Sequence, residues 1–379
     1  MRSYLLVMVV AAAVTYLLTP VARRFAERFR AMTPVRERDV HSVPTPRLGG
    51  LAMLCGLAAS FLVGSQVPFL REIFTTSRSA WAVLAAAALV SLIGAVDDVW
   101  GLDPLTRLAG QVLAGGLLAW QGVQLLTLPI LGVTVGSGGM FLGLTIIAVV
   151  VTINAVNFID GLDGLAAGVM AIAGAAFFVY TYQLTRAASP SDYTSLAAVI
   201  AAAMVGCCIG FLPHNFNPAR IFMGDSGSYL IGLLLAASAI SVTGQIDPQV
   251  VSNAKLVPAF VPLLLPVAVL VIPLADLLLA VARRLKNGQS PFAADRMHLH
   301  HRLLDLGHTQ VRAVLIMYLW ASVIAFGSVS LAFVSWQVAL AAGVVVVTLS
   351  IALTMGPLRG RRLNAAATDL VTRRGDKRL

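Results

Sequence analysis

The sequence predicts an all-α polytopic membrane protein with about eleven transmembrane helices, and its composition is the first reason. Of 379 residues, 58% are hydrophobic and only 12% are charged, whereas about 25% are charged in a typical soluble domain. So few charges cannot cover a surface that faces water. This composition excludes a soluble enzyme, a disordered chain and a secreted disulfide scaffold.

The spacing of apolar runs is the second reason. A helix needs roughly 20 apolar residues to cross a hydrocarbon core about 30 Å thick. Runs near that length lie at 3–19, 48–66, 79–96, 106–121, 139–157, 165–184, 194–212, 227–243, 256–281, 311–334 and 336–355. The fourth run is the weakest, because it carries Arg107, Gln111 and Gln121.

The distribution of basic residues predicts the orientation. With the N-terminus outside, 22 of the 27 Lys and Arg residues fall in cytoplasmic segments and five fall outside, as the positive-inside rule requires. The C-terminus is then cytoplasmic, and residues 357–379 form a basic cytoplasmic tail. The net charge of +10 fits loops lying over anionic lipid, so no nucleic-acid partner is expected.

Acidic residues within or beside membrane helices are costly, and they point to function. The first such group, Asp97 and Asp98, ends the third run. Two adjacent carboxylates there repel each other and face the negative end of the helix dipole. A metal ion or Arg107 could offset this charge, and one carboxylate could act as a general base. The alternative is a solvated helix end.

A second group consists of Asn154, Asn157, Asp160 and Asp163, spaced three residues apart at the end of the fifth run and just after it. On a helix these positions share one face. Four oxygen-bearing side chains suit a hard cation such as Mg²⁺. The alternative is a simple turn between two helices, which the sequence DGLDG also favours.

A third group lies in NPARIFMGDSGS, before the eighth run. Asp225 could cap the following helix, or the helix start could bind phosphate. Phe222 could be an aromatic residue at the membrane interface or a stacking platform for a nucleobase.

Basic loops supply the remaining candidates. His298, His300 and His301 do not match the ligand spacing of a zinc site. With Arg302 beside them, they suit an anionic oxygen, by charge or by proton transfer. In the first loop, His41, Arg47 and the Gly49–Gly50 pair lie where a lipid phosphate could reach them, although a basic loop over anionic lipid is the simpler interpretation.

Together, the segments PTPRLGG, VDDVWGLDP, NAVNFIDGLDGLAAG, NPARIFMGDSGSYLIG and MHLHHRLLDLGHT resemble the polyprenyl-phosphate N-acetylhexosamine-1-phosphate transferase family, glycosyltransferase family 4. The resemblance implies that residues 1–356 form a single integral-membrane catalytic domain. Its active-site loops would lie at about 20–47, 97–107, 157–164, 213–226 and 282–310. The site would face the cytoplasm from a bacterial plasma membrane.

The resemblance also implies roles for the candidate residues. Mg²⁺, with Mn²⁺ as an alternative ion, would be held by Asn157 and Asp225. Catalytic roles would fall to Asp97, Asp98, Asp160, His300 and His301. The uracil would meet Asp163 and Phe222. The other substrate-binding residues would be Asn154, His298, Arg302, Arg107, His41 and Arg47.

The histidine motif is most similar to the WecA-like branch, which transfers GlcNAc-1-phosphate from UDP-GlcNAc to undecaprenyl or decaprenyl phosphate and releases UMP. We therefore expect UDP-GlcNAc, a polyprenyl phosphate and the lipid bilayer as partners, and a homodimer is consistent with the family. The alternatives are transfer of phospho-MurNAc-pentapeptide, GalNAc or QuiNAc phosphate, and a transporter of lipid-linked sugars.

Overall fold

The computed structural model describes residues 1–32, 44–125, 137–188, 194–243, 285–286, 288, 308–335 and 337–355, and nearly all of them are helical. The first helices are α1 (Arg2–Arg28), α2 (Gly49–Gln66), the short α3 (Arg71–Thr75), α4 (Ser79–Trp100) and α5 (Pro104–Trp120). The central ones are α6 (Gly138–Ile159), α7 (Leu165–Ala188), α8 (Leu196–Asn215) and α9 (Gly224–Thr243). The last are α13 (Gln310–Phe333) and a terminal helix, Gln337–Met355.

The predicted class, an all-α polytopic membrane protein, is confirmed. In the described ranges, nine helices are long and apolar enough to cross a membrane, and a helix satisfies its own backbone groups in lipid. Ten of the eleven predicted runs coincide with helices, while 256–281 lies outside the described residues. The tenth helix is α5, which has 17 residues. The total of eleven spans, the orientation, the domain bounds and the homodimer stay predictions.

Polar side chains set the starts of several helices. A cap of this kind accepts hydrogen bonds from N–H groups that the first turn leaves without partners. In the described chain such caps begin α5, α6, α8 and α13, and they are Asp103, Ser137, Ser195 and Thr309.

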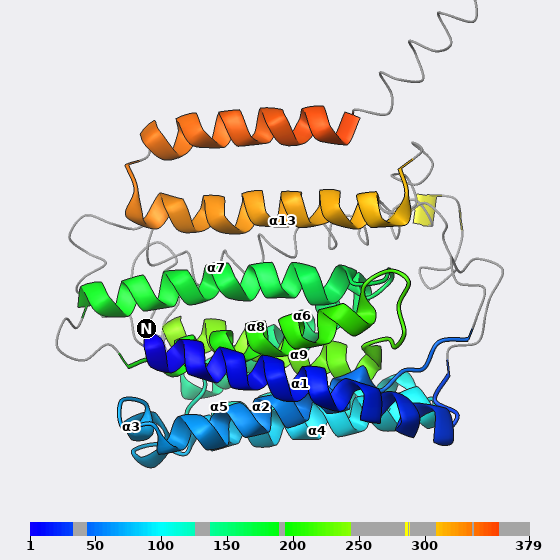
Figure 1. The fold of residues 1–379 in the computed structure, drawn as a ribbon. Helices are drawn as coiled ribbons and strands as arrows, with labels where there is room; N and C mark the ends of the chain where they lie inside the picture. Colours follow the sequence, from blue (N-terminus) through cyan, green and yellow to red (C-terminus); the bar gives the residue numbers. More distant parts are fainter. Residues whose placement is uncertain are drawn as a thin grey trace, which may run out of the picture.

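The helices lie side by side, with α9 at the centre of the bundle (Figure 1). The span within α9 is 89% buried, and α9 packs against α2, α4, α6 and α8. By contrast, α13 and the terminal helix form a layer beyond α7, and the span in the terminal helix is only 6% buried. An apolar helix surface with that little protein contact is suited to face lipid.

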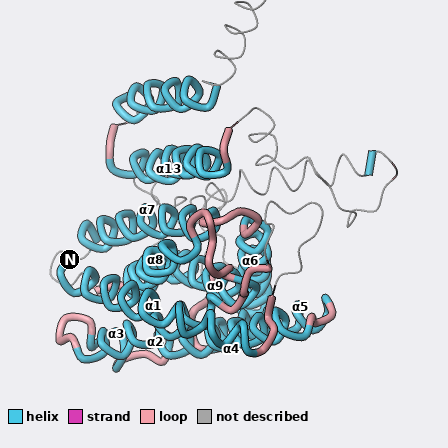
Figure 2. Tube along the Cα trace, turned by 45° about the vertical axis from the view of Figure 1, so that its right-hand side comes forward, coloured by secondary structure: helices cyan, strands magenta, loops and turns pink. Residues whose placement is uncertain are grey.

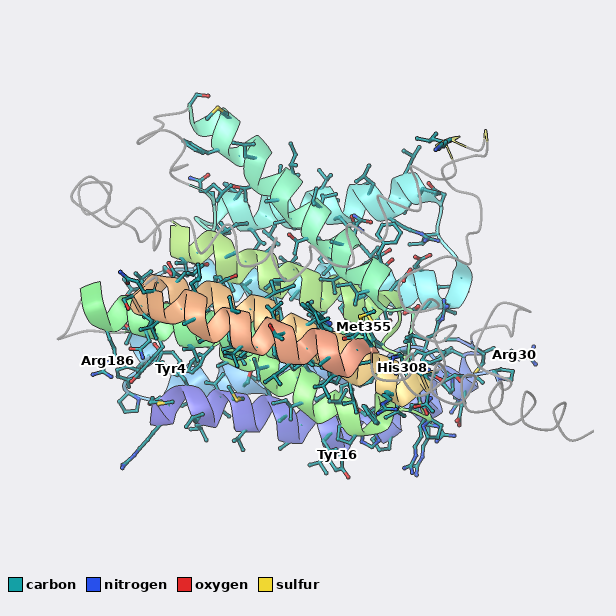
Figure 3. All side chains as sticks on the ribbon, turned by 90° about the horizontal axis from the view of Figure 1, so that it is seen from above. Tyr4, Tyr16, Arg30, Arg186, His308 and Met355 are labelled. Atoms are coloured by element: carbon teal, nitrogen blue, oxygen red, sulfur yellow. The ribbon has the colours of Figure 1, made fainter. Side chains whose placement is uncertain are left out.

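The two ends of the bundle carry different residues. Figure 3 shows Tyr4 and Arg186 at one end, and Arg30 and His308 at the opposite end. This is the alternation that the predicted topology requires, because Arg186 is expected outside and Arg30 inside. At the end that holds Arg30, the loops that precede α7 and α9 lie close together (Figure 2).

At Gly94, α4 approaches the first turn of α9 at backbone distance. A Cβ atom on Gly94 would lie 2.5 Å from the carbonyl carbon and oxygen of Asp225 and from the amide nitrogen of Ser226. Glycine at this position therefore brings the end of α4 against the start of α9.

We predict that Gly94→Ala lowers the melting temperature of the protein in detergent, measured by tryptophan fluorescence. Overpacking costs about 1–3 kcal/mol, which exceeds the roughly 0.5–1 kcal/mol that alanine gains over glycine in a helix. The matched control is Gly143→Ala in α6, where an added Cβ meets nothing within 4 Å. Equal melting temperatures for the two variants would contradict the prediction.

Candidate active site

The segment before α2 holds the loop that leads into α9. The amide of Phe222 donates to the carbonyl of Pro46 at 2.8 Å, and the amides of Gly49 and Gly50 donate to the carbonyls of Phe222 and Met223 at 3.1 Å each. These bonds satisfy N–H groups that the start of α2 would otherwise leave without partners. Both glycines are buried, and in this structure their amides serve the contact between the two loops.

Asp98 caps α9 from another helix. Its Oδ1 accepts a hydrogen bond from the amide of Asp225 at 3.0 Å, and its Oδ2 accepts one from the amide of Ser226 at 3.1 Å. The Asp98 side chain is fully buried. Gly224, with φ of 69°, leaves room for the carboxylate. The partial positive charge at the start of α9 thus offsets the carboxylate at the end of α4. The residue whose side chain caps α9 is Asp98 rather than Asp225.

Two arginines face the carboxylates. The Nε atom of Arg107 lies 2.9 Å from Oδ2 of Asp97, and its NH1 atom lies 3.9 Å from Oδ2 of Asp225. The NH1 atom of Arg47 lies 3.9 Å from Oδ1 of Asp98. Arg107 therefore offsets Asp97, which is one of the two possibilities that the sequence left open. Both arginine side chains are more than a third exposed, so an anion from solution can reach them.

Asp225 lies at the centre of this cluster. Its Oδ1 accepts a hydrogen bond from Nδ2 of Asn157 at 2.8 Å, and Nδ2 of Asn157 also donates to Oγ of Ser228 at 2.9 Å. The hydroxyl of Tyr229 donates to Oδ2 of Asp225 at 3.5 Å. Ser228 and Tyr229 were not predicted from the sequence as site residues, although their i+3 and i+4 spacing from Asp225 places all three on one face of a helix.

Asp160 follows the last residue of α6 and keeps part of its surface exposed. Burial of the carboxyl, and then repulsion from the carboxylate of Asp225, raises the pKa of Asp160 to about 7. Near neutral pH this group can therefore bind or release a proton.

Asp163 holds the loop between α8 and α9. Its Oδ2 accepts hydrogen bonds from Nδ2 of Asn217 at 2.9 Å and from the amide of Ala219 at 3.0 Å. Nearby, Asn215 accepts from the amide of Gly164 at 3.1 Å and donates to the carbonyl of Ile221 at 3.0 Å. Asp163 is buried, so in this structure it acts on the loop that carries Phe222. Contact of either residue with uracil stays a prediction.

The remaining candidates are more distant or lie outside the described residues. Asn154 contacts α5 rather than the carboxylates, because its Nδ2 donates to Oε1 of Gln111. Gln111 was not singled out as a site residue. The candidates outside the described residues are His41, His298, His300, His301 and Arg302.

Three predicted groups thus converge at one end of the bundle. Asp98 from α4 contacts the α9 backbone at Asp225, and Asn157 from α6 contacts the Asp225 side chain. Within the described ranges, no group of three or more His, Cys, Asp or Glu side chains forms a ready-made metal cluster. The donors present are carboxylate and amide oxygens, which suit Mg²⁺ completed by water and substrate phosphate.

Several known proteins are similar to this chain in sequence. The family model described as glycosyl transferase family 4 matches residues 80–243, which include α4, α6 and α9. The chain is 45% identical to the decaprenyl-phosphate N-acetylglucosaminephosphotransferase of Mycolicibacterium smegmatis, over 95% of this chain and 90% of the relative.

Two further relatives are less similar. A probable undecaprenyl-phosphate N-acetylglucosaminyl 1-phosphate transferase of Bacillus subtilis is 30% identical over 82% of this chain and 80% of the relative. A phospho-N-acetylmuramoyl-pentapeptide-transferase of Desulforudis audaxviator is 32% identical over 80% of this chain and 90% of the relative. The similarity extends well beyond the matched segment, through most of the helical bundle and the acidic end described above, and it shows that this chain belongs to glycosyl transferase family 4.

Proposed function

We propose that this protein transfers GlcNAc-1-phosphate from UDP-GlcNAc to a polyprenyl phosphate, at the cytoplasmic face of a bacterial plasma membrane. The observation that carries the proposal is the contact of Asp98, Asn157 and Asp225, from three helices, at one end of a membrane bundle. The name of the Mycolicibacterium smegmatis relative, at 45% identity, favours GlcNAc as the sugar and decaprenyl phosphate as the acceptor, and the Bacillus subtilis relative, at 30% identity, names GlcNAc with undecaprenyl phosphate.

In this reaction an oxygen of the polyprenyl phosphate attacks the β-phosphorus of UDP-GlcNAc. A new pyrophosphate bond forms, the bond from the β-phosphorus to the oxygen bridging to the α-phosphorus breaks, and UMP leaves with that oxygen. Phosphoryl transfer depends mostly on positioning and on neutralising charge. A bundle end beside lipid suits it, because the polyprenyl tail remains in the membrane while the sugar nucleotide arrives from water.

Different described residues are suited to different parts of this reaction. Arg47 and Arg107 are exposed enough to receive phosphate oxygens. Asp160, with a pKa near 7, is suited to accept a proton from the acceptor phosphate. Asp97 and Asp98 keep Arg107 and α9 in place.

Asn157 and Asp225 are the residues that would hold Mg²⁺, with Mn²⁺ as an alternative. When bound, the ion neutralises the phosphate oxygens as charge moves to the leaving group. The donor set fits this role, because an amide and a carboxylate, both with oxygens that suit Mg²⁺, already lie in contact here. Asp97 and Asp225 also crowd against one shared arginine, which leaves negative charge for a cation to balance.

The test is a donor-specificity assay on purified protein with decaprenyl phosphate. We expect UMP release from UDP-GlcNAc, loss of release in EDTA and recovery with Mg²⁺. UDP-GalNAc, which differs at one hydroxyl, is the matched control donor and should give little product. Transfer from UDP-GalNAc or UDP-MurNAc-pentapeptide in place of UDP-GlcNAc would refute the proposed sugar. Full activity in EDTA would refute the metal requirement.

A further inference from the structure

A pair of amide side chains, one buried and one half-buried, joins α5 to α6 one turn from the carboxylate cluster. Nδ2 of Asn154 donates to Oε1 of Gln111 at 2.6 Å and to the carbonyl of Val150 at 2.8 Å. Gln111 is only 2% exposed. Both hydrogens of the Asn154 amide therefore have partners, one in its own helix and one across the helix interface.

The pair lies one turn deeper than the site on both helices. Arg107 precedes Gln111 by four residues on α5, and its guanidinium contacts Asp97 and Asp225. Asn157 follows Asn154 by three residues on α6, and its amide contacts Asp225. The two helices run in opposite directions, so fixing Gln111 against Asn154 also fixes Arg107 relative to Asn157.

In the part of the chain that the structure describes, α5 has few helix neighbours. This helix packs mainly against α4 and α6 and lies at the edge of the bundle (Figure 2). Leu105, Leu113 and Trp120 are 76%, 64% and 79% exposed. Apolar contacts between helices in lipid lack a strong hydrophobic driving force, and hydrogen bonds between side chains contribute instead. A shift of α5 along α6 would separate the pair and leave polar groups without partners.

We propose that Gln111 is a positioning residue, which sets the register of α5 on α6 through Asn154 and thereby places Arg107 at the carboxylates. Asn154 is then part of this helix contact rather than a substrate ligand. The role of Gln111 in the reaction rests on the proposed function, whereas its effect on the register of α5 does not.

The test is a double-mutant cycle with Gln111→Leu, Asn154→Leu and the double variant. Leucine keeps much of the side-chain volume but removes the hydrogen bond. We expect each single variant to lower kcat for UMP release about tenfold or more, with the KM for UDP-GlcNAc changed less than twofold. The double variant should be no slower than the slower single variant, because both substitutions remove one interaction.

Two controls separate positioning from a general loss of stability. Thr152→Val on α6 removes a hydroxyl whose bond, among the described residues, goes to the carbonyl of Ala148 in its own helix, and it should keep the wild-type kcat. The exchanged pair, Gln111→Asn with Asn154→Gln, restores both amides and should recover most of the lost kcat. The same set of variants, compared by melting temperature, measures the coupling between Gln111 and Asn154 without any substrate.

The outcomes are distinct. If the wild type released UMP and the leucine variants had the same kcat, the inference would be overturned and the proposed function would remain. Independent, additive losses in kcat and melting temperature would also overturn it. If the wild type released no UMP from any donor, the proposed function would fail together with the role of Gln111 in the reaction, while non-additive melting temperatures would still show the register contact.

Discussion

Asp225→Asn is expected to reduce UMP release by roughly 10³-fold while the protein remains folded. The substitution removes one negative charge from the centre of the cluster, and loss of one such electrostatic contact to a transition state commonly costs 10²–10³-fold in rate. Asparagine has nearly the same shape: its oxygen can still accept from Asn157, which contacts Asp225 at 2.8 Å, and its NH₂ group can donate to the hydroxyl of Tyr229, which contacts Asp225 at 3.5 Å. The melting temperature should therefore stay close to that of the wild type.

The measurement compares kcat with that of Asp103→Asn, a matched control in the same part of the molecule. Asp103 is an exposed carboxylate that caps α5, and asparagine caps a helix about as well as aspartate. This control should retain near wild-type activity and stability. If Asp225→Asn kept more than a tenth of the wild-type rate, Asp225 would have no place in the chemistry proposed.

Asp98→Asn is expected to reduce both activity and stability, which separates it from Asp225→Asn. The buried carboxylate of Asp98 accepts from two amides at the start of α9, at 3.0 and 3.1 Å. An asparagine can accept from one of them, but its NH₂ group would face the other. Leaving a buried donor without a partner costs about 1–3 kcal/mol. Because α9 carries Asp225, a shift of its first turn should lower kcat by about 100-fold, an effect typical of losing a supporting contact.

The two aspartate variants should be measured together, by thermal unfolding and by UMP release at saturating Mg²⁺. The expected pattern is a lower melting temperature for Asp98→Asn alone and a loss of rate for both. Wild-type stability in Asp98→Asn would show that its carboxylate does not hold α9. A normal rate with reduced stability would restrict Asp98 to a structural role.

Much of the fold follows from local properties of the chain. The bilayer requires about 20 apolar residues per span, and nine of the ten described helices that match predicted runs satisfy this requirement. The pairing of Arg107 with Asp97 was also predictable, since both residues flank one short turn between α4 and α5. Helix length, hydrophobicity and capping patterns concern neighbouring residues and do not predict contacts between distant ones. The cap that Asp98 supplies at Asp225, 127 residues away, could therefore not be predicted from the sequence.

The sequence by itself determined that this protein is a helical bundle in a membrane and that its acidic groups gather at the ends of helices. Hydrophobic length and residue type are properties of each segment alone. Only the tertiary structure decided which partner each amide and carboxylate has. Asn157 contacts Asp225, whereas Asn154, three residues earlier, bonds to Gln111. The physical reason is that a hydrogen bond extends only about 3 Å, so the packing of each helix against its neighbours determines which polar groups can meet.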